Sequence, residues 1–112
     1  MDDSTPIDPW HAPVEEMVAR YLATLEADDR GATEAHLRAA LRAEPIARGC
    51  PTLAMITPVD LLGLRAHLEL HGAEDVEAAL DALEAFLSWA HATGAHTLSA
   101  SVVAFALRPP EI

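Results

Sequence analysis

The sequence predicts an all-α fold, a compact bundle of about five helices. The chain has 112 residues and is 51% hydrophobic, much of it alanine and leucine, which are among the best helix formers. Apolar residues recur at steps of three and four, and capping and stop signals separate the segments. This length fits one domain. We expect residues 1–12 to be a flexible acidic leader and residues 13–112 to be a single helical domain.

The first helix is expected at residues 13–29. Pro13 suits a first helical turn, and the two glutamates that follow favour the positive end of the helix dipole. One apolar stripe runs along this segment: Val14, Met17, Val18, Tyr21, Leu22 and Leu25. Gly31 stands where a helix terminator belongs, so we expect the helix to end just before it.

The second helix is expected at residues 33–43, with Thr33 as its cap and Pro45 beyond its end. An irregular connection then covers residues 45–57. Its apolar side chains indicate that it folds over the core: Ile46, Leu53, Met55 and Ile56.

The third helix is expected at residues 58–71, because Thr57 is a good cap and a proline follows it directly. Its apolar row is Leu61, Leu64 and Leu68. The fourth helix is expected at residues 75–93, and Gly94 stops it.

The last segment, residues 98–107, fits two structures. A strand would suit its β-branched and aromatic residues, Val102, Val103 and Phe105. A helix would suit Thr97 and Ser99 as caps, and a lone strand would have no partner in this chain. We therefore predict a short helix.

The net charge of −11 limits the classes of partner. All seven basic residues are arginine, and no cluster of cations exists to bind a phosphate backbone or an anionic membrane. We therefore expect no nucleic acid and no membrane as partners. A basic protein surface would be attracted, although such acidity also serves solubility alone. A single cysteine, Cys50, excludes an internal disulfide and fits a cytoplasmic location.

Two histidines of the third helix, His67 and His71, form the candidate metal site. They are four residues apart, so on a helix they share one face and can chelate a divalent ion. A third ligand would have to come from His36, Cys50, Glu74, His91 or His96. The alternative is an exposed helix face, where histidines near the C-terminus interact well with the dipole. We expect no cofactor, and a divalent metal remains the alternative.

The candidate partner-binding surface is an acidic row on the fourth helix. Its residues step by three, four and three, so they share a face: Glu74, Glu77, Asp81 and Glu84. No arginine lies within that span, and we expect these charges to be uncompensated. Trp89 lies off the centre of the apolar stripe and is a candidate interface residue. An ordinary solvated face and a partly buried tryptophan are the alternatives.

Three functions follow from these features. The leading hypothesis is a protein-interaction module: an accessory subunit, a regulator, or a neutraliser of a basic partner. The second is a small metal-binding domain or metal-dependent enzyme that uses His67 and His71. The third is a helical DNA-binding regulator, which the charge disfavours. No pattern typical of an enzyme active site is present, and Cys50 has no base near it in sequence. Alanine-rich helices also leave a homodimer open.

Overall fold

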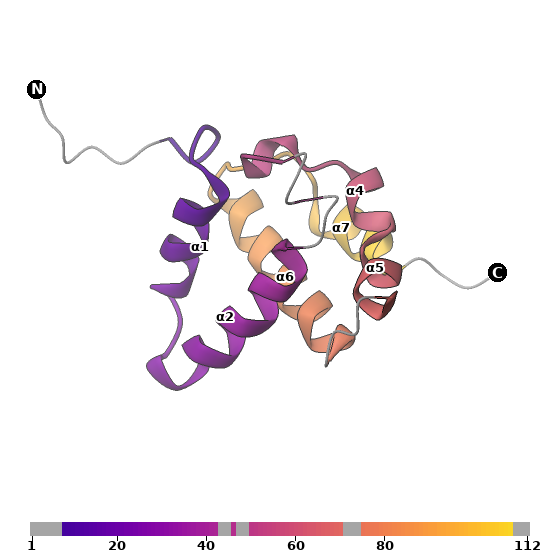
Figure 1. Ribbon diagram of the computed structural model, residues 1–112. Helices are drawn as coiled ribbons and strands as arrows, with labels where there is room; N and C mark the ends of the chain where they lie inside the picture. The colour runs from indigo at the N-terminus through magenta and orange to yellow at the C-terminus, as the bar shows by residue number, and fades with distance from the viewer. Residues whose placement is uncertain (1–7, 43–45, 47–49, 71–74, 109–112) are drawn as a thin grey trace, which may run out of the picture.

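A computed structural model describes residues 8–42, 46, 50–70 and 75–108 of the chain. Within these ranges the fold is all-α, as predicted, and no strand is present (Figure 1). The helices are α1 (Val14–Leu22), α2 (Ala27–Leu41), α4 (Pro58–Leu62), α5 (Leu64–Leu70), α6 (Val76–Ala92) and α7 (Ala100–Leu107). A 3-10 turn, η1, covers Leu53–Met55. None of the described helices is long and apolar enough to cross a bilayer.

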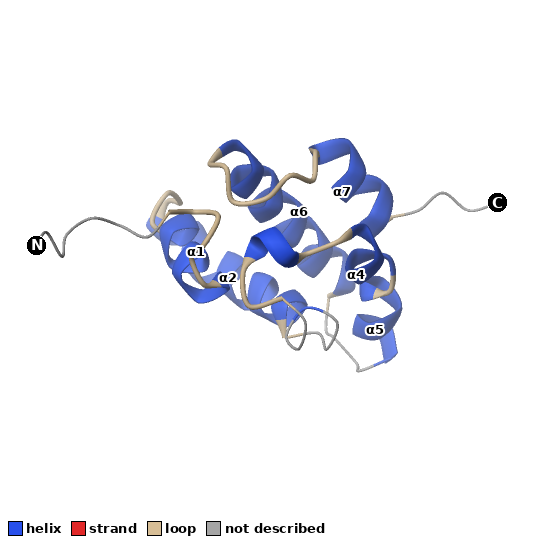
Figure 2. Cartoon of the chain, turned by 90° about the horizontal axis from the view of Figure 1, so that it is seen from above, coloured by secondary structure: helices blue, strands red, loops and turns tan. Residues whose placement is uncertain are grey.

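Helix α6 lies at the centre of the bundle. Seen from above, α1 and α2 lie on one side of it and α4, α5 and α7 lie on the other (Figure 2). Contacts between elements agree, because α6 touches α1, α2, α5 and α7. Its buried residues repeat at helical spacing: Ala79, Leu80, Leu83, Phe86, Leu87 and Ala90. A helix that is covered on several sides needs this wide apolar surface.

An aromatic cluster joins the first helix to the central one. The ring centroid of Tyr21 lies 5.2 Å from that of Phe86 and 5.4 Å from that of Trp89. Phe86 and Trp89 stack with their centroids 6.1 Å apart. Such aromatic pairs add to the stabilisation that burial of their area provides.

The boundary between the first two helices differs from the prediction. Helix α1 ends at Leu22, not near residue 29, and α2 begins at Ala27, not at residue 33. Arg30 is the physical reason, because its guanidinium donates to the carbonyls of Leu22 (3.0 Å) and Leu25 (3.1 Å). The Leu22 carbonyl also accepts from the Leu25 amide (3.1 Å), so these bonds together hold the turn between the two helices. Gly31 lies inside α2, so its assignment as a terminator was wrong. The predicted end of this helix at residue 43 lies outside the described residues.

The predicted helix at residues 58–71 is divided in two at Gly63. This residue ends α4 with φ −89° and ψ −3°, and α5 starts at the next residue. Glycine has a poor helix propensity, which makes it the weakest point of such a segment. The start is as predicted: Thr57 and Asp60 form a capping box. The buried row is also as predicted, with Leu61, Leu64 and Leu68 inside.

The second half of the chain follows the prediction closely. Asp75 caps α6 by accepting a hydrogen bond from the Ala78 amide at 3.0 Å. Gly94 ends the helix region with φ +87°, a left-handed conformation that glycine adopts without strain. Ser99 then caps α7, whose Val102 amide donates to the serine oxygen at 3.3 Å. The helical prediction for this segment is therefore confirmed, and the strand alternative is wrong.

The connection at residues 45–57 does fold over the core where the structure describes it. Ile46, Cys50, Leu53 and Ile56 are all buried, whereas Met55 is 52% exposed, so the prediction was wrong for that side chain. Before α1, residues 8–12 form a turn in which the His11 and Ala12 amides both donate to the Asp8 carbonyl at 2.9 Å. Ala12 is buried there. Residues 1–7 lie outside the described part of the chain.

Candidate interaction surface

An apolar groove runs between α4 and α7. It encloses about 250 Å³ and is lined by Pro58, Leu62, Ser101, Val102, Phe105 and Ala106. The sequence of α7 explains it, because no charged residue occurs between Ala100 and Leu107. Its inner side packs on the core through Val103, Ala106 and Leu107. The opposite side faces solvent with Val102 and Phe105, and its polar residue is Ser101.

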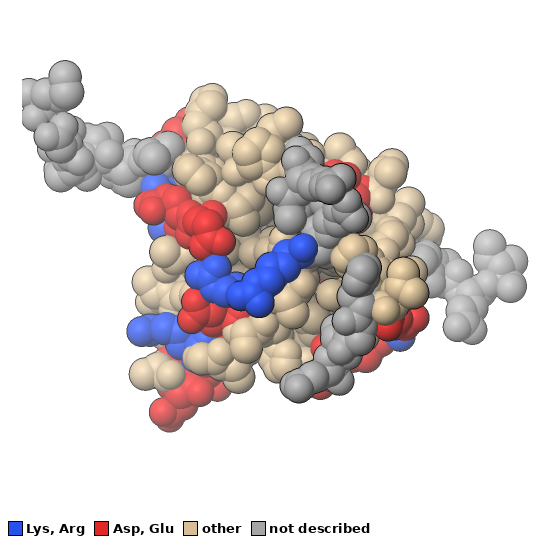
Figure 3. Space-filling model, in the orientation of Figure 1, with Lys and Arg blue, Asp and Glu red and all other residues tan. Residues whose placement is uncertain are grey.

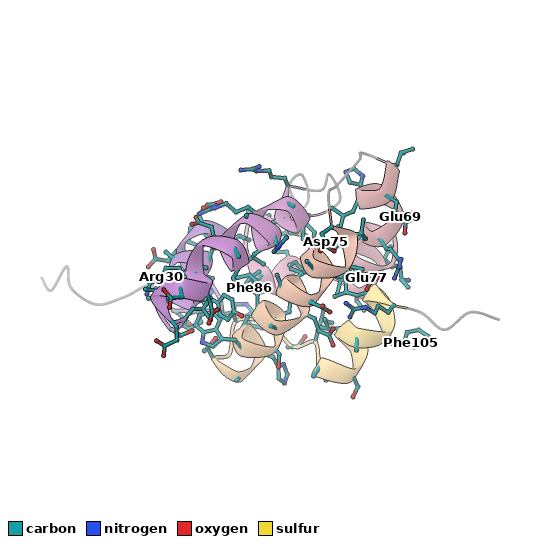
Figure 4. All side chains as sticks on the ribbon, turned by 90° about the horizontal axis from the view of Figure 1, so that it is seen from below. Arg30, Glu69, Asp75, Glu77, Phe86 and Phe105 are labelled. Atoms are coloured by element: carbon teal, nitrogen blue, oxygen red, sulfur yellow. The ribbon has the colours of Figure 1, made fainter. Side chains whose placement is uncertain are left out.

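The exposed side chains of the groove are large. Phe105 is 59% exposed, Leu62 47% and Val102 40%. Figure 4 shows Phe105 pointing away from the helices at the end of the molecule where Glu77 and Glu69 also lie. Scattered single apolar residues are ordinary on a protein surface, but several around one groove are typical of an interaction site. This groove was missed at the sequence level. The available signal was a short helix without a charged residue, in which apolar side chains occur outside the buried stripe as well.

The acidic row of α6 is not uncompensated, and that prediction was wrong. Arg108, the residue that follows α7, pairs with three of its members. The Nε atom lies 3.3 Å from Glu77, Nη1 lies 2.7 Å from Glu84, and Nη2 pairs with Asp81. The spacing argument considered cations within the helix only, and this cation comes from the next helix.

The row still has a negative balance and remains accessible to solvent. Three carboxylates share one guanidinium, and Arg65 of α5 pairs with Glu77 from the other side. The side chain of Asp81 is 71% exposed and that of Glu77 is 53% exposed. Glu74, the first predicted member, lies outside the described residues. The groove and the acidic row meet at the end of α7, because Phe105 lies three residues before Arg108, which contacts the row.

Charged side chains elsewhere form a separate group. In the space-filling view they gather mainly over α1 and α2, and a further acidic group lies towards α5 (Figure 3). Over α1 and α2 they pair with one another: Arg38 of α2 contacts Glu15 of α1 at 2.9 Å and Glu34 at 2.8 Å. The Arg38–Glu15 pair joins the two helices, and the Arg38–Glu34 pair lies within α2.

Trp89 belongs to the core side of the molecule rather than to the groove. It is half-buried and contacts Tyr21 and Phe86 in the aromatic cluster. The structure therefore separates Trp89 from the lining of the α4–α7 groove, and its role in partner binding stays a prediction.

The histidine pair can be described only in part. His67 lies on α5 and is half-buried, whereas His71 lies outside the described residues. Among the side chains that the structure describes, no three histidine, cysteine or acidic groups gather as a metal site. The metal hypothesis stays a prediction.

Cys50 is a buried thiol. Its Sγ atom lies 3.6 Å from a carboxylate oxygen of Asp60 and 3.7 Å from the carbonyl of Met55. Burial, with the charge of Asp60 beside it, raises the pKa of Cys50 to about 11. A thiol with so high a pKa is a poor nucleophile at neutral pH.

A second buried polar group, His96, was considered in the sequence only as a distant metal ligand. It is 3% exposed. Its Nε2 atom lies 2.7 Å from the Leu87 carbonyl, and its Nδ1 atom accepts a bond from the Leu98 amide at 3.0 Å. Those partners assign the proton to Nε2. Burial lowers the pKa of His96, which keeps the ring neutral. This histidine links the end of α6 to the segment that leads into α7.

Comparison with known proteins finds no protein-family model, no curated protein and no solved structure that matches this chain.

Proposed function

We propose that this chain is a protein-interaction module, an accessory subunit or regulator that binds a partner with a basic surface. The α4–α7 groove carries the proposal. Phe105, Val102 and Leu62 hold large apolar surfaces in solvent. Burial of such surface is the main favourable term in protein association.

Charge favours a basic partner. The chain has a net charge of −11, which attracts cationic surfaces over a distance and accelerates their encounter. Arg108, which contacts the acidic row, follows the groove residue Phe105 by three positions, so a partner seated on Phe105 would meet the row as well. Apolar contact would supply affinity there, and charge would supply orientation.

The other two hypotheses have less support. The metal hypothesis depends on His71, which lies outside the described residues, and elemental analysis of the untagged protein tests it. For DNA binding, the helix that would enter the groove of a duplex is α6, and its exposed face carries carboxylates. Those groups would repel phosphate.

Site-specific crosslinking in the native cells tests the proposal. A photoreactive phenylalanine analogue placed at position 102 should crosslink one partner, and the crosslinked peptide of that partner should be basic. The same analogue at position 70 is the matched control, because Leu70 is 82% exposed and lies outside the groove. Position 70 should not give that product. Equal crosslinking from both positions, or none from position 102, would contradict the proposal.

A further inference from the structure

We infer that the segment bound in the α4–α7 groove is a basic amphipathic helix of another protein. Its apolar side chains would cover Phe105, Val102 and Leu62, and its arginines or lysines would face the acidic row of Glu77, Asp81 and Glu84. The inference rests on the proposed function and specifies the partner.

The walls of the groove favour a helix over an extended peptide. Both walls are helical, and the described residues offer no free strand edge with which an extended peptide could pair. A partner must therefore be recognised through side chains. Helix α7 has eight residues and is about 12 Å long at 1.5 Å per residue. That length matches apolar residues at positions i, i+3 or i+4, and i+7 of a docked helix.

The border of the groove favours positive charge on that helix. Phe105 lies three residues before Arg108, so a helix seated on Phe105 ends near the carboxylates that Arg108 contacts. Asp81 keeps 71% of its side chain exposed although it is paired with Arg108. A cation on the partner can therefore reach this carboxylate without the removal of Arg108.

Charge disfavours a second copy of this chain in the same groove. Each copy would bring a net charge of −11 to an acidic border. Several of its arginines already form contacts within their own chain. Arg38, Arg65 and Arg108 pair with carboxylates, and Arg30 donates to backbone carbonyls. Few cations remain to compensate the border of a second copy.

Synthetic peptides test this inference directly. The probe is an arginine-bearing peptide of about two heptads, with leucines on one helical face. Its controls are a peptide of the same composition in scrambled order and one with glutamate in place of arginine. Affinity is measured by fluorescence anisotropy with labelled peptide at two salt concentrations. We expect the amphipathic basic peptide to bind at least about tenfold more tightly than either control.

Variants of the protein locate the binding. Phe105→Ser and Val102→Ser should each weaken the amphipathic peptide by about tenfold or more, since central apolar anchors dominate affinity. Asp81→Asn should weaken it by about threefold and reduce its salt dependence. Leu70→Ser and Glu26→Gln are the matched controls, exposed but outside the groove and the row, and should bind as the wild type does. Circular dichroism checks that each variant is folded.

Three results would overturn the inference. One is equal binding of the scrambled peptide, which would indicate attraction of charge alone. Another is binding that both Phe105→Ser and Val102→Ser leave unchanged. The third is a wild-type dimer in sedimentation that Phe105→Ser converts to a monomer, which would place a second copy in the groove. Failure of the peptides while position 102 still crosslinks a basic partner would reject the helix and leave the proposed function standing.

Discussion

Arg108 and Glu84 are joined across two helices, with Nη1 of the arginine 2.7 Å from a carboxylate oxygen of the glutamate. The same guanidinium also contacts Glu77 and Asp81. A single residue at the end of α7 therefore forms ion pairs along about two turns of one face of α6. This contact fixes α7, and α7 forms one wall of the groove.

Replacement of Arg108 should destabilise the fold. Arg108→Ala removes three ion pairs and leaves like charges adjacent on α6, so we expect a loss of about 1 kcal/mol in the free energy of unfolding. Urea denaturation measures it, and high salt should reduce the difference from wild type. Arg42→Ala is the control, because Arg42 is exposed and pairs with no carboxylate among the described residues. A loss equal to that of the control would contradict the contribution of these ion pairs.

Acidification should weaken the protein through His96. Its pKa in the folded chain is lowered from the ordinary value of 6.5, chiefly by burial. The folded state therefore favours the neutral ring. The stability that this preference contributes is complete at pH values above the pKa of His96 in the unfolded chain. It is lost as the pH falls from that value through the lower pKa of His96 in the folded chain. Protonation would also turn Nδ1 into a donor that faces the Leu98 amide. The free energy of unfolding, measured at about pH 7.5 and about pH 5, should fall more in the wild type than in His96→Gln. An identical pH dependence in both proteins would contradict this role.

The thiol of Cys50 should be unreactive in the folded protein. Because its pKa is raised to about 11 and the side chain is 5% exposed, little accessible thiolate exists near neutral pH. We expect an aromatic disulfide reagent at about pH 8 to react at least about a hundredfold more slowly with native protein than with protein unfolded in urea. Comparable rates in the two states would show that the site is open.

Two glycines should respond to alanine with opposite signs. Gly31 lies inside α2, with open space where the methyl group of an alanine would project, so Gly31→Ala should stabilise the protein by roughly 0.5–1 kcal/mol. Gly94 has φ +87°, so Gly94→Ala should destabilise it by about 1 kcal/mol or more. Thermal and urea denaturation measure both changes. Effects of the same sign would contradict one of the two backbone assignments.

The helices with strong local signals could be predicted from the sequence. Asp75 caps the start of α6 and Gly94 follows its end, so both limits of this helix depend on residues next to it in the sequence. The prediction for Gly31 was wrong because this glycine is not left-handed and lies inside α2, while a bond from Arg30 to the Leu22 carbonyl closes the turn after α1. That bond spans eight residues and leaves no periodic pattern.

The candidate surface was harder to predict from the sequence than the helices were. The acidic row could be found, because helical spacing places its members on one face. Its partner Arg108 could not, since it is 24 residues from Glu84 and only the packing of α7 on α6 brings them together. The groove likewise requires α4 and α7 to meet, so neither Leu62 nor Phe105 signals it alone.

The aromatic cluster has a consequence for how the chain folds. The rings of Tyr21 and Phe86 lie 5.2 Å apart, yet more than half of the chain separates them in sequence. The hairpin of α6 and α7 needs only a short loop to close, whereas docking of α1 must close a long one at a greater cost in chain entropy. Contacts between residues distant in sequence slow folding. We therefore expect α1 to dock late, and the fluorescence of Trp89, 5.4 Å from Tyr21, to record that step in refolding kinetics.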